Sequence, residues 1–152
     1  MEQATSKEID YSFIKRFETG TGKPILTIFR NKIDDNVEGG YGHVFGTYSK
    51  VGHLVGTTIT SEQAEQFFKS DIKKAQNIYM PYLDWEKLTE TQIQAVTSHA
   101  YNTGKRSETI VKLLNAGEIA QLRKWWKTHW ISSGGNVISG LVTRRAFESE
   151  LL

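Results

Sequence analysis

Residues 38–43 read Glu-Gly-Gly-Tyr-Gly-His, and this stretch says more about the chain than any other. Three glycines among six residues allow the backbone to approach another group closely, because glycine carries no side chain. The tyrosine and the histidine beside them present polar, aromatic edges. The stretch therefore predicts an extended segment at a binding site.

Four carboxyl side chains lie close before or within this stretch: Glu18, Asp34, Asp35 and Glu38. A pair of carboxyl groups is the minimum equipment for acid/base cleavage of an acetal. Asp34 and Asp35 are also ordinary turn residues, and Glu18 and Glu38 could be solvated surface acids. We expect the chemistry at Glu18 and at residues 38–43.

Length and composition predict one packed domain. The chain has 152 residues, 38% of them hydrophobic, and two prolines, which suits one globular domain and is too short for two ordinary ones. It contains no cysteine, which excludes thiol nucleophiles and thiolate metal sites. No apolar run is long enough for a membrane span, and the first residues lack the layout of a secretory signal. We expect a soluble chain, made in the cytoplasm.

Charge is distributed unevenly along the chain. Residues 1–103 carry 11 Lys and Arg against 13 Asp and Glu, whereas residues 104–152 carry 8 against 4. A basic last part suits a polyanionic partner such as cell wall, nucleic acid or anionic membrane. A solvated basic helix face explains the same pattern equally well.

The first 60 residues combine a helix with strands. Apolar residues at helical spacing predict a short helix over residues 9–18, and the glycines and proline of residues 19–24 end it. Residues 25–29 read Ile-Leu-Thr-Ile-Phe and predict a strand, and an extended segment resumes at Val37. We expect residues 25–60 to form a small antiparallel sheet.

The rest of the chain is predicted to be helical. Capping boxes at Thr60 and Thr89 predict the starts of two helices, the first running to about Tyr79. Further helices are expected over Thr109–Asn115, over Ile119–Trp130 and over a last segment that carries Leu141, Val142, Phe147 and Leu151.

These elements predict an α+β fold in a single domain, residues 1–152. A sheet lobe would cover about residues 19–60, and a larger helical lobe about residues 61–152 together with the N-terminal helix. A cleft between two lobes is the natural place for a ligand.

Five groups of residues occur in order along the chain: Phe13-Ile14-Lys15-Arg16-Phe17-Glu18; Gly40-Tyr41-Gly42-His43; Ile59-Thr60-Ser61-Glu62-Gln63-Ala64 with Ser70-Asp71-Ile72; Gln92, Ala95, Ser98 and Tyr101-Asn102-Thr103-Gly104 with Leu113-Leu114-Asn115-Ala116-Gly117; and Gly134-Gly135 with Gly140-Leu141-Val142-Thr143-Arg144-Arg145 and Glu148. Together they resemble the phage-type lysozymes, the glycoside hydrolase family of phage endolysins and T4-type lysozyme. The resemblance covers nearly the whole chain and implies a lysozyme-like fold.

The resemblance also implies a reaction, the hydrolysis of the β-1,4 bond between N-acetylmuramic acid and N-acetylglucosamine in peptidoglycan. Glu18 would be the general acid that protonates the leaving oxygen. The implied enzyme is a lysozyme, an N-acetylmuramidase that lyses bacterial cell walls without a cofactor. The alternative is a lysozyme-like module that binds peptidoglycan and has lost catalysis.

The chain departs from the family at the other catalytic positions. Counting back five and eleven residues from His43, where the family has a Thr and an Asp, gives Glu38 and Lys32. We hypothesise that Glu38 acts as a water-activating base or as a nucleophile, with Asp35 as electrostatic support. Asp34 or Asp35 could supply the missing carboxylate if the hairpin differs in length.

The remaining site predictions are one structural pair and a set of substrate contacts. His43 is expected to be a structural histidine that pairs with Asp71, because no second ligand stands beside it at metal-binding spacing. We predict no metal. The predicted substrate-binding residues are Tyr41, Val44, Tyr101 and Asn102, although core packing explains the tyrosines almost as well.

Residues 123–130 combine tryptophans with basic side chains, a composition also found in nucleic-acid-binding helices. Leu122, Trp126 and Trp130 recur every four residues, however, which favours a buried stripe. We therefore expect peptidoglycan strands as the partner, with an immunity or inhibitor protein as a further candidate, no nucleic acid and a monomeric chain. Action on the wall, in the periplasm or outside the cell, would follow delivery by a holin, a phage tail or a secretion system.

Overall fold

A computed structural model describes residues 9–152. Contacts between Cα atoms divide these residues into two compact units, Asp10–Ile72 and Lys73–Leu152, the latter with Ile9. The first unit holds the sheet and the first helix, and the second is helical apart from one short hairpin. The α+β class predicted from the sequence is confirmed.

The first unit begins with helix α1, Ser12–Thr19. Asp10 Oδ1 accepts a hydrogen bond from Ser12 N at 2.8 Å, ahead of the first turn. Phe13 and Ile14 are buried, and Gly20 ends the helix with φ 78°, its N–H donating to Arg16 O. Glu18 therefore lies in the last turn of this helix.

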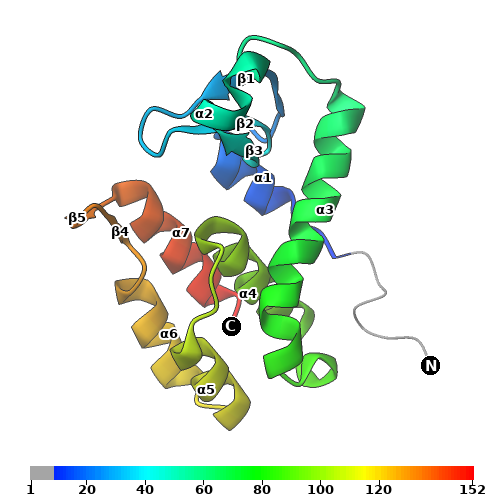
Figure 1. Cartoon of the computed structure of the whole chain (residues 1–152). Helices are drawn as coiled ribbons and strands as arrows, with labels where there is room; N and C mark the ends of the chain where they lie inside the picture. Colours follow the sequence, from blue (N-terminus) through cyan, green and yellow to red (C-terminus); the bar gives the residue numbers. More distant parts are fainter. Residues whose placement is uncertain (1–8) are drawn as a thin grey trace. The chain divides into compact units, whose positions relative to one another are not determined.

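Strands β1 (Ile25–Arg30), β2 (Asn36–Gly40) and β3 (His43–Thr47) form an antiparallel sheet in the order β1-β2-β3 (Figure 1). Glu38 lies on the central strand, opposite Phe29 of β1 and Val44 of β3. The register of β2 against β3 shifts between Val37 and Glu38, so the strand is irregular at the carboxylate.

The sheet is shorter than the sequence predicts. Residues 48–54 form helix α2 (Tyr48–Val51) and a 3₁₀ turn, η2 (Gly52–Leu54), and a single bridge joins Thr27 to Thr58. The prediction of a sheet extending to residue 60 is therefore wrong over this segment. Elements of three or four residues are too short to produce a periodic pattern in a sequence. The pattern of residues 48–54 therefore does not distinguish α2 and η2 from a loop or a strand.

Helix α3, Ser61–Tyr79, begins and ends where the sequence predicts. Gln63 N donates to Thr60 Oγ1 at 3.0 Å, and Thr60 N donates to Gln63 Oε1 at 2.9 Å, which completes the predicted capping box. Residues of α3 up to Ile72 belong to the first unit, and those from Lys73 onward belong to the second.

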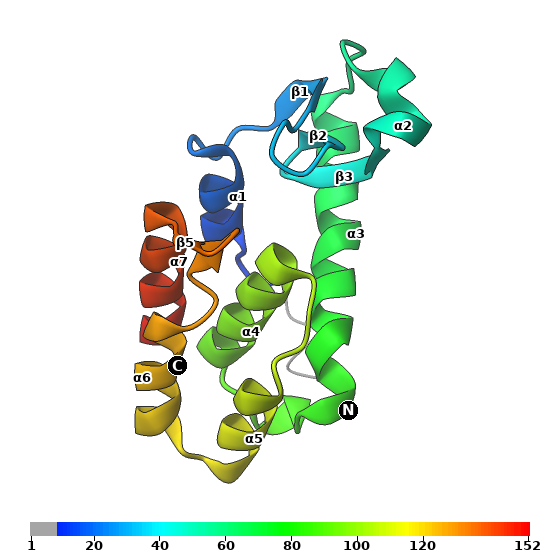
Figure 2. The same cartoon turned by 60° about the vertical axis from the view of Figure 1, so that its left-hand side comes forward.

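The second unit continues with the 3₁₀ turns η3 (Met80–Tyr82) and η4 (Trp85–Lys87) and then with helices α4 (Glu90–Thr103), α5 (Glu108–Ala116), α6 (Ile119–Thr128) and α7 (Ser139–Glu150). Strands β4 (Ser132–Ser133) and β5 (Asn136–Val137) form a hairpin before α7. Helix α7 packs beside α6 and α4 (Figure 2). Fully buried side chains of α4, α5 and α6 form much of the core: Ile93, Val96, Ile110, Leu122 and Trp126.

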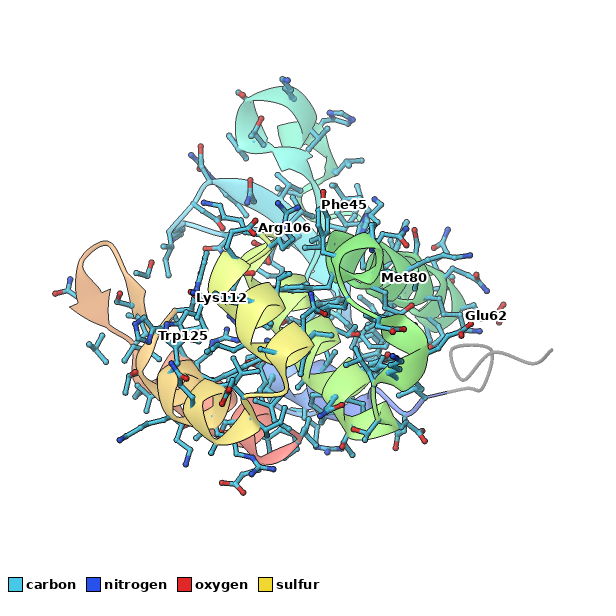
Figure 3. All side chains as sticks on the ribbon, turned by 90° about the horizontal axis from the view of Figure 1, so that it is seen from below. Phe45, Glu62, Met80, Arg106, Lys112 and Trp125 are labelled. Atoms are coloured by element: carbon cyan, nitrogen blue, oxygen red, sulfur yellow. The ribbon has the colours of Figure 1, made fainter. Side chains whose placement is uncertain are left out.

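Two features of this unit differ from the sequence prediction. Helix α6 ends at Thr128, and Trp130 lies beyond it with φ 60° and 38% of its surface exposed, so the buried stripe contains Leu122 and Trp126 only. Trp125, labelled in Figure 3, also lies on α6. Its ring stacks on that of His129, with ring centroids 4.5 Å apart. In α7 the buried face is polar: Arg144, Arg145, Glu148 and Ser149 are buried, while Val142 and Phe147 are exposed.

Candidate active site

Glu18 lies against the glycine-rich turn between β2 and β3. Gly42 in this turn has φ +80°, a conformation that side chains rarely adopt. A Cβ atom built on Gly42 would overlap Glu18 Oε1 and would stand 3.3 Å from Glu18 Cδ. The glycine is therefore required twice, once for the backbone conformation and once for the space that the carboxylate of Glu18 occupies.

Glu38 is the second carboxylate that the fold brings to this place. Its side chain is partly buried in the middle of the sheet, and Asn31 Nδ2 donates to Glu38 Oε2 at 2.9 Å. Burial raises the pKa of Glu38 above its ordinary value, the hydrogen bond from Asn31 lowers it, and the charges of Asp34 and Glu18 raise it further. The charge of Glu18 is therefore near enough to act on Glu38.

Asp34 and Asp35 lie in the exposed turn between β1 and β2. Asp35 has φ 63°, and its Oδ1 accepts a hydrogen bond from Arg30 Nε at 2.5 Å. Asp34 Oδ1 accepts from Asn36 N at 3.0 Å, as in an ordinary Asx turn. Of the two, it is Asp34 whose charge acts on Glu38, whereas the carboxylate of Asp35 is engaged by Arg30.

Asn31 is the residue that the sequence reasoning missed. It precedes Lys32, the position reached by counting back from His43, and its amide, not an aspartate, contacts Glu38. A lone asparagine in a turn gives no functional signal by itself. The signal that could have located it is the length of the hairpin, because the turn of residues 31–35 sets which side chain faces β2.

His43 is held from two sides at the start of β3. Its Nδ1 lies 2.7 Å from Asp71 Oδ2 of α3, and its ring stacks on Phe67, with centroids 4.2 Å apart and 9° between the ring planes. These contacts tie the strand that follows the glycine-rich turn to helix α3. They stabilise the backbone on which the turn, and through it Glu18, depends.

The expected substrate-binding residues fall in both units. In the first, Val44 is exposed on β3, whereas Tyr41 is buried, with its ring against Phe68 and with Lys15 Nζ 4.7 Å from its centroid. In the second, Tyr101 is partly buried beside the core, and Asn102 Oδ1 accepts a hydrogen bond from Arg145 Nη2.

Two further properties concern residues 9–152 only. No group of three or more His, Asp and Glu side chains among them is arranged to hold a metal ion. None of their helices combines the length and apolar character that crossing a membrane requires.

Comparison with known proteins identifies a protein family to which the chain is similar. The model of the phage lysozyme family matches residues 26–148. The endolysin of Bacillus phage PZA is 34% identical over 115 residues, covering 74% of this chain and 42% of that protein. The endolysin of Acyrthosiphon pisum secondary endosymbiont phage 1 is 30% identical over 119 residues, covering 74% of this chain and 76% of that protein. The chain thus spans about two fifths of the Bacillus phage relative's length.

Solved structures share the fold. The muramidase domain of SpmX from Asticaccaulis excentricus has a TM-score of 0.73 and 22% identity, covering 95% of this chain and 96% of that one. The endolysin from Escherichia coli O157:H7 phage FAHEc1 also has a TM-score of 0.73, with 24% identity, covering 95% and 92%. At these identities the likeness concerns the fold alone.

Proposed function

Since the chain belongs to the phage lysozyme family, we propose that it is a peptidoglycan muramidase, a glycoside hydrolase that lyses bacterial cell walls. The bond cleaved is the β-1,4 bond between N-acetylmuramic acid and N-acetylglucosamine. One observation of the structure carries the proposal: the carboxylate of Glu18, on α1, lies against Gly42 of the glycine-rich turn, and Glu38 lies on β2, the strand that leads into this turn. Glycoside hydrolysis commonly uses two carboxyl groups, one as general acid and the other as base or nucleophile.

Glu18 is the general acid in this proposal. It gives its proton to the glycosidic oxygen as the bond from that oxygen to the anomeric carbon breaks. The space left by Gly42 lets its carboxyl group lie at the turn, and a substituted turn residue would displace it. Its position at the end of a helix with a buried apolar face keeps that placement rigid.

Glu38 is the base or the nucleophile. As a base it takes a proton from a water whose oxygen bonds to the anomeric carbon, which inverts the configuration. As a nucleophile its own oxygen bonds to that carbon, and water later hydrolyses the intermediate, which retains it. Its raised pKa makes the carboxylate of Glu38 a stronger base than that of an exposed glutamate. The anomer released first from a defined oligosaccharide distinguishes the two routes.

Supporting roles are assigned to the other candidates. Asp34, whose charge acts on Glu38, is electrostatic support in place of the expected Asp35 or beside it. Val44 is exposed on β3, directly opposite Glu38 of β2, and is a substrate contact. Tyr41, Tyr101 and Asn102 remain proposed substrate contacts. We also propose that the protein acts outside the cytoplasm, after delivery by a holin, a phage tail or a secretion system. A monomeric state and an inhibitor protein as a partner remain proposals as well.

The test is lysis of purified cell walls by the wild type and by the Glu18→Gln variant. Loss of a general acid is expected to lower the rate by about a hundredfold or more. Glu62→Gln is the matched control, because Glu62 is an exposed acid of the same unit. Wall binding without lysis by the wild type would overturn the enzyme proposal and indicate a binding module.

A further inference from the structure

The turn between β1 and β2 holds Asn31 in one place. Its backbone N–H donates to Asn36 O at 2.7 Å, and its carbonyl accepts from Asp35 N at 2.8 Å. Its side-chain Oδ1 accepts from Ile33 N at 3.0 Å. A partly buried asparagine with three such bonds has little freedom to turn away from the sheet.

These bonds also decide which end of the side-chain amide faces Glu38. A backbone N–H can only donate, so the group that meets Ile33 N must be the carbonyl oxygen of the Asn31 side chain. The NH₂ group therefore points at Glu38, and Nδ2 lies 2.9 Å from Oε2. Among residues 9–152, the other oxygen, Oε1, has no hydrogen-bond partner.

We propose that Asn31 is a positioning residue for Glu38: its side-chain amide holds Oε2 and so directs Oε1 toward the water or the anomeric carbon. This inference rests on the proposed muramidase function, because it assigns a role within that site. It goes beyond the family resemblance, which offers only an aspartate and a threonine for the second half of the site and thus no amide.

The surrounding charges explain why a donor is needed. The charges of two other acids, Glu18 of α1 and Asp34 of the turn, act on Glu38, and the cation Arg30 of the same hairpin is paired with Asp35. Burial and both acids oppose the ionised form of Glu38, and the amide of Asn31 is the group that favours it. Without this donor the carboxylate would lose its orientation, and its pKa would rise further.

The experiment measures lysis against pH for the wild type, Asn31→Ala and Asn31→Asp. In Asn31→Ala the acid limb of the profile is expected to move up by about one pH unit, which is about a tenfold loss of rate on that limb. Asn31→Asp keeps an acceptor for Ile33 N but sets a like charge against Glu38, so its shift is expected to be larger. Asn36→Ala removes an amide from the same hairpin that does not touch Glu38, and its profile is expected to match the wild type.

A second readout does not depend on activity. In protein labelled with carbon-13 at the glutamate carboxyls, the titration midpoint of Glu38 is expected to rise in both Asn31 variants and to stay unchanged in Asn36→Ala. Unchanged midpoints in folded Asn31 variants overturn the role of Asn31, even where the wild type lyses walls and Glu38→Gln does not. A wild type without lytic activity, or a fully active Glu38→Gln, overturns the proposed catalytic role instead.

Discussion

At the scale of single residues, His99 is a titratable side chain that is fully buried. It belongs to α4 and lies between the rings of Trp126 and Trp130, with centroids 5.2 and 5.5 Å away. Neither ring nitrogen has a hydrogen-bond partner within residues 9–152. Burial lowers the pKa of His99 well below its ordinary value, and the cations Arg145 and Arg144 of α7 lower it further, so the folded protein holds this histidine neutral.

The sign of the pH dependence follows from this environment. Below about pH 6.5 the unfolded chain binds a proton at His99 that the folded chain does not, so the free energy of unfolding falls by about 1.4 kcal/mol per pH unit from this group. His99→Phe is expected to remove that slope between pH 6.5 and 5. Urea unfolding across this range measures it, with the exposed His53→Gln as control. An unchanged slope in His99→Phe contradicts the prediction.

The candidate site shows how far single residues can be predicted from sequence. Glu18 and Gly42 were predictable because a recognisable motif contains each of them, and the structure sets them in contact. Asn31 was not, because its role depends on how a five-residue turn directs one side chain toward β2. Asp35, which the sequence predicts as electrostatic support for Glu38, has its carboxylate paired with Arg30 instead.

At the scale of elements, α7 is unusual because charged side chains form its buried face. Glu148 is fully buried and accepts hydrogen bonds from Ser98 of α4, from Trp126 Nε1 of α6 at 3.0 Å, and from Arg144 and Arg145. Arg144 and Arg145 stand four and three residues before it, respectively, which places them on the same helix face as Glu148. One carboxylate thus joins three helices.

Removing that carboxylate is expected to be costly. Glu148→Ala leaves two buried guanidinium groups without their shared anion, and such a change costs about 3–5 kcal/mol of unfolding free energy. Urea denaturation measures the loss. Glu150→Ala, at an exposed position of the same helix, is expected to stay within about 0.5 kcal/mol of the wild type. Equal effects of the two substitutions would show that the buried network does not stabilise the fold.

The elements predicted correctly have strong local signals. Helices α3 and α4 begin at capping boxes, which combine two side-chain hydrogen bonds with an apolar period of several turns. The elements that were missed, α2 and the β4–β5 hairpin, contain four residues or two per strand and bury none of them. Packing and turn geometry decide such segments, and neither is visible in a local pattern. Trp130 is a similar case. Its spacing from Leu122 and Trp126 predicts that it belongs to their buried stripe, but helix α6 ends at Thr128, before Trp130.

At the scale of the whole molecule, the structure shows which of the basic side chains of residues 104–152 are exposed. Of these eight basic residues, Arg144 and Arg145 are buried with Glu148, and Arg106 is paired with Glu108. The exposed remainder includes three cations of α6: Arg123, Lys124 and Lys127. The basic character therefore belongs to a helix surface rather than to the whole segment, and this surface is the candidate contact for anionic wall polymers.

Adsorption to purified cell walls tests this assignment in the Glu18→Gln background, where the walls should stay intact. Joint replacement of Arg123, Lys124 and Lys127 by Gln is expected to weaken adsorption at low salt and to flatten its fall as salt rises, because screening acts on exposed charges. Replacing Lys69, Lys73 and Lys74 of α3 by Gln removes the same net charge from another exposed surface. If the two triple variants lose adsorption equally, overall charge rather than the α6 surface attracts the wall. A larger loss in the α6 variant, confined to low salt, places the contact on that helix.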